Sequence, residues 1–471
     1  MGEAKGEKLR TAEDENRKRI FEDLPVPEAL RLMVVPTIIS QIVVLIYNMA
    51  DTFYVGRTND PMMVAGVSLI LPVFNLLICL AGLAGIGGGT LISRLLGEQR
   101  PDEARRVSWF ALYISIAISF CYSVIMGIFM EPILRLLGAS DLIFVYARQY
   151  VFCVIVLGAV PTVLSNVLSN LVRSTGLSKE ASIGITLGGV LNIGLDPLFM
   201  FVLLPSGYEV LGVGIATCLS NCIACLYFFY IVYRTAKRDK GRAVITFNMK
   251  AGMPGKKSIF SMFFVGIPAS VSSFLFDLDY VIIDKLMVSY SEVALAAMGI
   301  VLKVERLPIN VGIGICQGMM PLVAYNYASG NHKRMDGVIG CARKLGLLVA
   351  AVSIVCYELF APVIVRFFIS DAATVPLATN FLRARVLASP LMFTSFFTVY
   401  LFQSFGLGNR SMFLAVMRWA VFNIPMLFIL NAVFDMYGIV WSQAAADLLT
   451  VALSLYVYGR FKKKHLELTL S

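Results

Sequence analysis

Long apolar stretches alternate with short polar connections along most of the chain. Each stretch runs roughly 20–25 residues, which is enough for a helix to cross a hydrocarbon core of about 30 Å. The apolar runs are continuous, whereas barrel strands would be shorter and would alternate in polarity. The pattern predicts an all-α integral membrane protein with about twelve transmembrane helices. They begin near Ala29, Met62, Val107, Leu142, Ala181, Gly212, Ile259, Glu292, Leu345, Val375, Ser411 and Tyr437.

The composition supports this prediction, and the charges orient the chain. A soluble domain of 471 residues cannot bury a chain that is 58% hydrophobic and only 15% charged. Most of the 40 Lys and Arg residues lie in the tails and the even-numbered connections. The opposite connections hold Arg57, Arg135, Lys285 and Arg366. We therefore expect a multi-pass plasma membrane protein with both termini cytoplasmic. The net charge of +10 is then a topology signal, and no nucleic acid partner is expected.

The two halves of the chain repeat one pattern. Gly66 and Gly299 are as far apart in the sequence as Gly97 and Gly330, and "STGLSK" and "SFGLGN" keep nearly the same offset. Six spans per half bring both halves into the membrane from the same side. This predicts two six-helix lobes related by a parallel repeat, with a central cleft between them. Such a duplication favours a transporter, and we expect it to act as a monomer.

The repeat sets the expected domain boundaries. We expect an N-lobe at residues 24–233, a basic cytoplasmic linker at 234–257 and a C-lobe at 258–460. Residues 1–23 and 461–471 would be cytoplasmic tails. The first tail is polar and mixed in charge, and it lacks the apolar core of a signal peptide. It is therefore expected to be disordered or to lie at the membrane interface.

One carboxylate lies deep within the fifth span, in "NIGLDPLFMF". Asp196 is costly there unless it has a function or a partner. Asn192 lies one turn earlier on the same helical face, and Pro197 has no N–H to donate, which frees the carbonyl of Ile193. These oxygens suit Na⁺, and the same carboxylate could hold a proton. A polar cluster that merely packs helices together is the alternative interpretation.

Four segments occur in a fixed order: "NMADTFYVGR", "LISRLLGEQRPDEARR", "NIGLDPLFMF" and "QGMMPLVAYNYASGNHKR". In this order they resemble the multidrug and toxic compound extrusion (MATE) family, nearer its bacterial drug-exporter branch. The resemblance extends over about residues 25–460. It implies a cation-coupled antiporter that exports amphipathic, often cationic compounds by alternating access. Na⁺ or H⁺ would be the coupling ion, and no other cofactor is expected.

The resemblance also implies a set of site residues. Asp51, which by position alone would be an interfacial residue, would join Asn192 and Asp196 in a cation site, with Thr217 as a supporting hydroxyl. The seventh span carries Asp277 and, near the repeat position of Asp51, Asp279. Both are candidates for the substrate cleft. Some members of the family bind a cation on this helix, but the partner carboxylate expected on the tenth helix is replaced here by the arginines of "FLRARVLASP".

The eighth span contains a third candidate for the cleft, Glu305 in "VLKVERLPIN". It shares one helical turn with Lys303 and Arg306. One interpretation is a salt-bridged structural cluster, and the other is a carboxylate that lines the cleft and meets cationic drugs. Candidate ion-pair partners of Asp277 or Glu305 are Arg383, Arg385 and Arg418.

Two alternatives to a drug exporter can be compared with the sequence. A flippase of lipid-linked saccharides with related architecture would favour basic residues in the cleft, so the arginines of the C-lobe keep it open. An intramembrane enzyme would need paired histidines or a Ser/Lys pair within spans, but His332 and His465 both lie in polar segments. We therefore expect no enzymatic activity. The glycine-rich "AGLAGIGGGT" lies within a span and follows no strand, so it predicts close helix packing rather than a phosphate loop.

Overall fold

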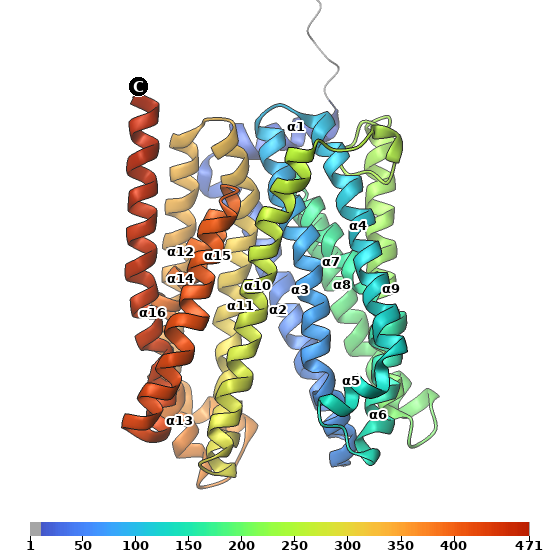
Figure 1. Cartoon of the computed structure of the whole chain (residues 1–471), viewed down its shortest axis with the longest axis vertical. Coiled ribbons are helices and arrows are strands. Elements are labelled where there is room, and N and C mark those ends of the chain that lie inside the picture. The colour runs from blue at the N-terminus through green and yellow to red at the C-terminus, as the bar shows by residue number, and fades with distance from the viewer. Residues whose placement is uncertain (1–10, 471) are drawn as a thin grey trace, which may run out of the picture.

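The chain folds into two helical bundles that stand side by side (Figure 1). The computed structural model describes residues 11–470, with side chains described as far as residue 463. All regular secondary structure in this part of the chain is helical. The N-lobe contains α2 (Val26–Gly56), α3 (Pro61–Gly97), α4 (Pro101–Ile128), α5 (Met130–Leu136), α6 (Asp141–Val151), α7 (Ala159–Ser174), α8 (Ser178–Pro197) and α9 (Glu209–Arg238). The C-lobe contains α10 (Lys256–Val288), α11 (Glu292–Ala328), α12 (His332–Phe368), α13 (Thr374–Val386), α14 (Ser389–Ser404), α15 (Gly408–Val416) and α16 (Ile424–Leu470).

Twelve passes can be traced through the described residues. Nine helices are long and apolar enough to cross a membrane, and two bent helix pairs raise the number to eleven. The last of these, Gly408–Lys463, contains non-helical backbone at Phe434 and Asp435, where the chain turns back on itself (Figure 1). Dividing it there gives the twelve spans that the sequence predicts. The predicted C-terminal tail continues α16 as far as Leu470.

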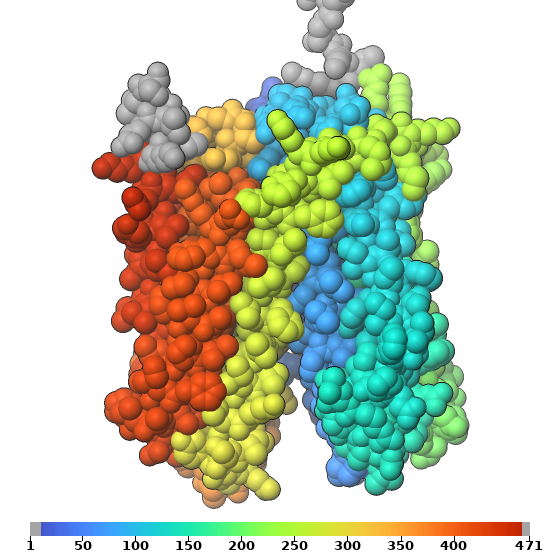
Figure 2. Space-filling model, in the orientation of Figure 1, coloured from blue at the N-terminus to red at the C-terminus, as the bar shows by residue number. Residues whose placement is uncertain are grey.

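The two lobes form a V that is open at one end. The start of α2 and the end of α16 lie at the same end, which is at the top in Figure 1 and is called the terminal face here. The space-filling view shows the lobes joined at this face and separated at the opposite, open face (Figure 2). A central cleft therefore runs from the open face toward the middle of the molecule, as the predicted architecture requires.

Glycines bring the two lobes together where α3 crosses α10. A Cβ atom added to Gly87 would lie 2.2 Å from the carbonyl oxygen of Met262, and one added to Gly266 would lie 2.0 Å from that of Leu83. No side chain fits at either position, so the backbones are in direct contact. The glycine-rich segment of the second span thus packs helices, as the sequence predicts, and its closest contact is with the opposite lobe.

The two bent spans are the fourth and the tenth, which carry internal arginines in the sequence. The fourth bends by 51° between Asp141–Leu157 and Ala159–Ser174, and the tenth by 49° between α13 and α14. A π-helical turn, η2 (Phe152–Leu157), precedes the first bend, and Pro161 and Pro390 follow the two bends. Such turns and prolines are the usual causes of sharp kinks.

The expected disorder of the N-terminal tail is wrong for residues 12–23. These residues form α1 (Ala12–Lys18) and a π-helical turn, η1 (Arg19–Asp23), across the terminal face, and we call them the N-terminal strap. Phe21 is fully buried, and its carbonyl accepts a hydrogen bond of 2.7 Å from Arg334 of the C-lobe. Glu13 accepts one of 3.1 Å from the backbone N–H of Val244, in the connection between the lobes. Residues 1–10 of the predicted tail lie outside the described residues.

Candidate cation site and C-lobe chamber

Asp196 and Asn192 lie near the end of α8, deep inside the N-lobe. Asp196 is fully buried and Asn192 is 3% exposed. The helix ends at Pro197 and continues as a π-helical turn, η3 (Leu198–Leu203). The missing N–H of the proline interrupts the α-helical bonding pattern, so the backbone loosens directly beside the buried carboxylate.

Asn192 connects the carboxylate to the next helix. Its Nδ2 lies 3.4 Å from Oδ1 of Asp196 and 3.2 Å from Oγ1 of Thr217 on α9. One amide group thus donates to both partners, which leaves its own oxygen free to accept. The structure therefore brings together the three residues that the sequence places on the fifth and sixth spans.

Asp51 reaches this group from α2. Its carboxyl group lies within hydrogen-bonding reach of the carboxyl group of Asp196. Two carboxylates in contact and away from water repel each other strongly unless a proton or a cation lies between them. The contact between the two carboxyls is therefore stable only with a bound proton or cation, because the side chains of the cluster carry no positive charge of their own.

Three oxygen atoms of this cluster have no hydrogen-bond partner among the described residues. They are Oδ1 of Asp51, Oδ1 of Asn192 and Oδ2 of Asp196, and each is buried. Buried polar atoms almost always find a partner, so three such acceptors in one place need an explanation. Oxygen atoms of carboxylates and amides are the ligands that hard cations prefer. The arrangement fits a bound Na⁺, and it equally fits a proton shared between the two carboxyls.

Two tyrosines near this cluster do not stand out in the sequence. The side chain of Tyr150, on α6, lies close to Thr217 and to both carboxyls. Tyr47 lies near Asp51, one turn earlier on α2. The spacing of Tyr47 and Asp51 was a usable signal, because residues four apart share a helical face. Tyr150 has no such signal, since only the fold brings α6 to this point.

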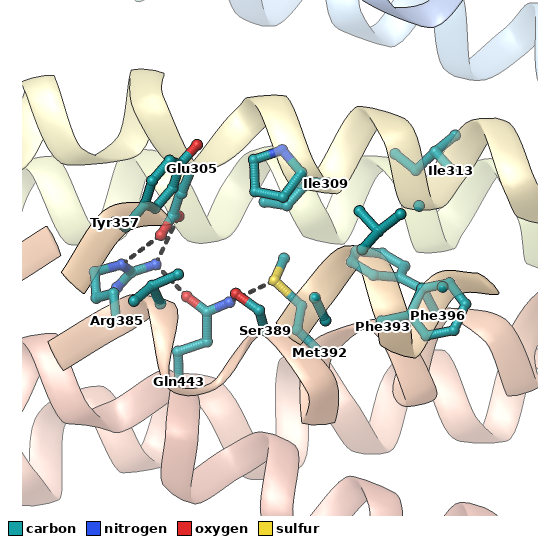
Figure 3. Close-up of a pocket in the computed structure, with 16 residues that line it drawn as sticks. Glu305, Ile309, Ile313, Tyr357, Arg385, Ser389, Met392, Phe393, Phe396 and Gln443 are labelled. Atoms are coloured by element: carbon teal, nitrogen blue, oxygen red, sulfur yellow. Dashed lines mark hydrogen bonds and ion pairs between the residues drawn. The ribbon is translucent and has the colours of Figure 1, made fainter. Parts of the chain in front are cut away.

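A second polar group surrounds Glu305 on α11, inside the C-lobe (Figure 3). Arg385 donates two hydrogen bonds of 2.8 Å to its carboxylate, from Nε and from Nη2. Tyr280 donates another of 3.2 Å, and Arg385 also contacts Gln443. Glu305 is thus part of a salt bridge, and its partner is Arg385, one of the candidate arginines, rather than Lys303 or Arg306 of its own turn. Its predicted role toward substrate stays a prediction.

The Glu305–Arg385 pair forms the polar end of a cavity of about 600 Å³, called the C-lobe chamber here. The remainder of the wall is mostly apolar and aromatic, and Figure 3 shows Ile309, Ile313, Phe393 and Phe396 along it. Glycines at 312 and 346 make room for the ring of Phe393, which packs against both. Apolar side chains therefore line most of the chamber. At its polar end, the opposite charges of Glu305 and Arg385 neutralise each other.

The remaining acidic candidates differ in their surroundings. Asp279 is 3% exposed and accepts a hydrogen bond of 2.6 Å from Asn423. Asp277 is half-buried and lies near Arg306 and near Cys79 of the opposite lobe. The two aspartates therefore point in different directions, as their spacing predicts. Asp279 belongs to the interior of the C-lobe, whereas Asp277 lies toward the junction of the lobes.

Two of the arginines have partners that the sequence analysis did not predict. Arg418 pairs with Asp447 of the last span, with Nε 2.9 Å from Oδ1, and both side chains are 2% exposed. Arg383 donates to the carbonyl of Glu358, at 3.2 Å from Nε and 3.0 Å from Nη2. Neither pairs with Asp277 or Glu305, so that expectation holds for Arg385 alone. Asp447 was overlooked, although its burial in an apolar span marks it as clearly as Asp196.

Comparison with known proteins gives a consistent result. The family model described as MatE matches residues 36–198 and again residues 268–429, once in each lobe. The chain is 31% identical over 444 residues to the multidrug export protein MepA of Staphylococcus aureus strain NCTC 8325 / PS 47, covering 93% of this chain and 95% of that protein. It is also 31% identical, over 442 residues, to MepA of Staphylococcus saprophyticus, with the same coverage.

Solved structures show the same fold. A crystal structure of a MATE protein in complex with MaL6 superposes with a TM-score of 0.89 at 23% identity, over 96% of this chain and 99% of that one. The outward-facing conformation of a multidrug resistance MATE family transporter superposes with a TM-score of 0.88 at 22% identity, with the same coverage. The double match to the family model, the relatives at 31% identity and the fold agree, and the chain belongs to the multidrug and toxic compound extrusion (MATE) family of membrane transporters.

Proposed function

We propose that the protein exports amphipathic, often cationic compounds across the plasma membrane in exchange for Na⁺ or H⁺. The observation that carries this proposal is the contact between the carboxyl groups of Asp51 and Asp196. This contact and the three buried oxygens without partners form a site that is stable only when a cation or a proton is bound. Relatives named as multidrug export proteins support the direction and the substrate class.

The shape of the molecule suits alternating access. With both termini in the cytoplasm, as the distribution of Lys and Arg indicates, the open face lies outside the cell and this conformation is the one that releases substrate. A cation that binds Asp51, Asn192 and Asp196 more tightly in one state than in the other shifts the balance between states. Pro36 in α2 and Pro197 at the end of α8 are suited to let these helices bend as the cation binds.

The substrate side of the proposal rests on the cleft and on the C-lobe chamber. Apolar and aromatic walls with a few polar groups are typical of sites that accept many drug-like molecules. Arg385 neutralises Glu305, so the chamber offers apolar contact rather than a net charge. Asp277, half-buried near the junction of the lobes, remains the candidate carboxylate for a cationic substrate.

A flippase of lipid-linked saccharides is not favoured. It would present basic side chains to the anionic groups of its substrate, but Arg383, Arg385 and Arg418 each bond to a partner within the C-lobe. The two MepA relatives are named for multidrug export instead.

The proposal is tested with purified protein in proteoliposomes that are loaded with a cationic dye. An imposed Na⁺ gradient and an imposed pH step are applied in separate experiments, and dye efflux is followed by fluorescence. We expect efflux with at least one of the two gradients, and Asp196→Asn should abolish it. Asp102→Asn, which changes an exposed aspartate in the first turn of α4, is the control and should transport normally. Full coupled transport by Asp196→Asn would refute the assigned role of Asp196.

A further inference from the structure

One arginine is buried in the N-lobe without an acidic partner. Arg173, at the end of α7, is 4% exposed. Its Nη1 lies 3.4 Å from Oδ1 of Asn170 and its Nη2 lies 3.3 Å from Oγ of Ser169, and both are long, neutral contacts. Its buried Nε has no partner among the described residues. Burying a charge is costly unless it is paired, so this guanidinium lacks the counter-charge that Arg385 and Arg418 have.

A small cavity of mixed polar and apolar lining lies beside this guanidinium, and both lobes form its wall. Residues of α3, α7 and α11 contribute to it. None of the residues described as lining it is acidic. The hydroxyls of Thr90, Ser93 and Ser174 donate to backbone carbonyls, so the donors that remain for a ligand are those of Arg173 and the side-chain amide of Gln317. A cavity with a buried, unpaired positive charge and no carboxylate has the chemistry of an anion site.

The close packing of α3 and α7 makes this cavity a defined part of the fold. A Cβ atom added to Gly85 would lie 3.1 Å from Nδ2 of Asn170, and one added to Gly89 would lie 3.1 Å from its carbonyl oxygen. Ser93 donates a hydrogen bond of 3.0 Å to the carbonyl of Ser174, near the terminal face. On the C-lobe side, Gln317 accepts one of 2.9 Å from Gln41. Contacts within the N-lobe and between the lobes therefore fix the positions of the polar side chains that line the cavity.

We propose that this cavity binds a small inorganic anion, of the size and charge of chloride, against Arg173. The anion supplies the missing counter-charge and accepts hydrogen bonds from the guanidinium of Arg173 and from the side-chain amide of Gln317. Since α3 and α7 belong to one lobe and α11 to the other, a bound anion links the lobes beneath the terminal face. It thereby stabilises the conformation in which this face is closed. The site is separate from the cation site and does not depend on which cation is coupled.

The test measures the thermal unfolding midpoint of the purified full-length protein in detergent. Chloride is titrated against the bulkier anion gluconate, with Na⁺ and ionic strength held constant. A ligand that binds the folded state alone raises the midpoint in a saturable way. We expect chloride to do so for the wild type, and we expect the increase to vanish in Arg173→Gln. Arg148→Gln, which removes an exposed arginine from the same lobe, should keep the full increase.

Two further variants separate anion binding from a purely structural role. Arg173→Lys keeps the charge and should retain a weakened chloride effect, whereas a structural defect would not depend on chloride. Gln317→Leu leaves Arg173 in place and should reduce the effect if the anion contacts both lobes. An undiminished effect in Gln317→Leu would overturn the link between the lobes.

Anomalous diffraction from crystals grown in bromide locates the ion directly. We expect a peak within contact distance of Arg173. Equal midpoints in chloride and gluconate, or crystals without a bromide peak in this cavity, would show that water alone fills it and would overturn the proposal.

Discussion

Asn423 donates a hydrogen bond of 2.6 Å to Asp279 across two spans of the C-lobe. In the internal repeat, Asn423 corresponds to Asn192, and Asp279 lies near the position of Asp51, a few residues before the strict offset. Arg385 and Arg418 lie close to Asp279. The electrostatic neighbours of Asp196, in the part of the chain that the structure describes, include no Lys or Arg. The C-lobe thus contains its own positive charges at the place where, in the proposed mechanism, the N-lobe takes up a cation.

This difference predicts unequal effects of two similar substitutions. Asp279→Asn should leave the cation concentration for half-maximal dye efflux within about two-fold of the wild type, since the arginines already neutralise this region. Asp196→Asn should remove the cation dependence altogether. The measurement is dye efflux as a function of Na⁺ concentration and of pH. A large shift in Asp279→Asn would indicate that a second coupling site exists in the C-lobe.

The Glu305–Arg385 pair predicts a strong effect on stability. Arg385→Met leaves the Glu305 carboxylate buried without its counter-charge, which should cost about 3–5 kcal/mol of unfolding free energy. Replacing both residues, as Glu305→Leu with Arg385→Met, should recover much of this loss because no uncompensated charge remains. Chemical unfolding of the three proteins in detergent measures the difference. If the double variant is no more stable than Arg385→Met, the pair contributes more to the unfolding free energy than the neutralisation of its two charges.

The crossing of α3 and α10 predicts that Gly266 does not tolerate a side chain. In Gly266→Ala the new methyl group would lie 2.0 Å from the carbonyl oxygen of Leu83, and this backbone atom cannot rotate away. The helices must separate, which should cost about 1–3 kcal/mol. Gly299→Ala is the matched control, because nothing lies within 4 Å of the added atom. Similar thermal midpoints for the two variants would contradict the proposed tightness of this crossing.

The N-terminal strap should bind the terminal face more firmly as the pH falls. Burial raises the pKa of Glu13, although the N–H of Val244 and the nearby Arg17 oppose this effect, while Asp239 adds to it. The docked strap therefore binds a proton more readily than the free segment. Its stability is greatest below the ordinary pKa of a glutamate and declines as the pH rises through the elevated value.

Trypsin cleavage after Arg17, Lys18 and Arg19 reports this docking. With rising pH the wild type should become more sensitive than Glu13→Gln, which has no charge to bury and serves as the reference at each pH. A constant ratio of the two cleavage rates across the pH range would refute the role of Glu13.

The sequence predicts those features that follow from the spacing of residues on one helix or from the internal repeat. Asn192 and Asp196 are four residues apart in one apolar span, so their common face follows from the helical period. Tyr150 and Arg173 acquire their surroundings only from other helices, and no local pattern marks them. The family resemblance, rather than any spacing, added Asp51 to the cation site.

The N-terminal strap shows why local composition misled the prediction of disorder. Residues 12–23 are polar and charged, which is typical of a free tail. Their partners, Val244 and Arg334, lie more than two hundred residues away in the sequence. Only the assembled terminal face provides the backbone groups and the pocket that receive Glu13 and Phe21.

The same separation sets an order of events during synthesis. The strap is made first, but Arg334 leaves the ribosome only after eight spans have been completed, because it lies in the first turn of α12. Until then Phe21 has no place to be buried, and the closure of the terminal face is unfinished. The strap is therefore among the first residues to be translated, yet its contact with Arg334 cannot form until the start of α12 has been made.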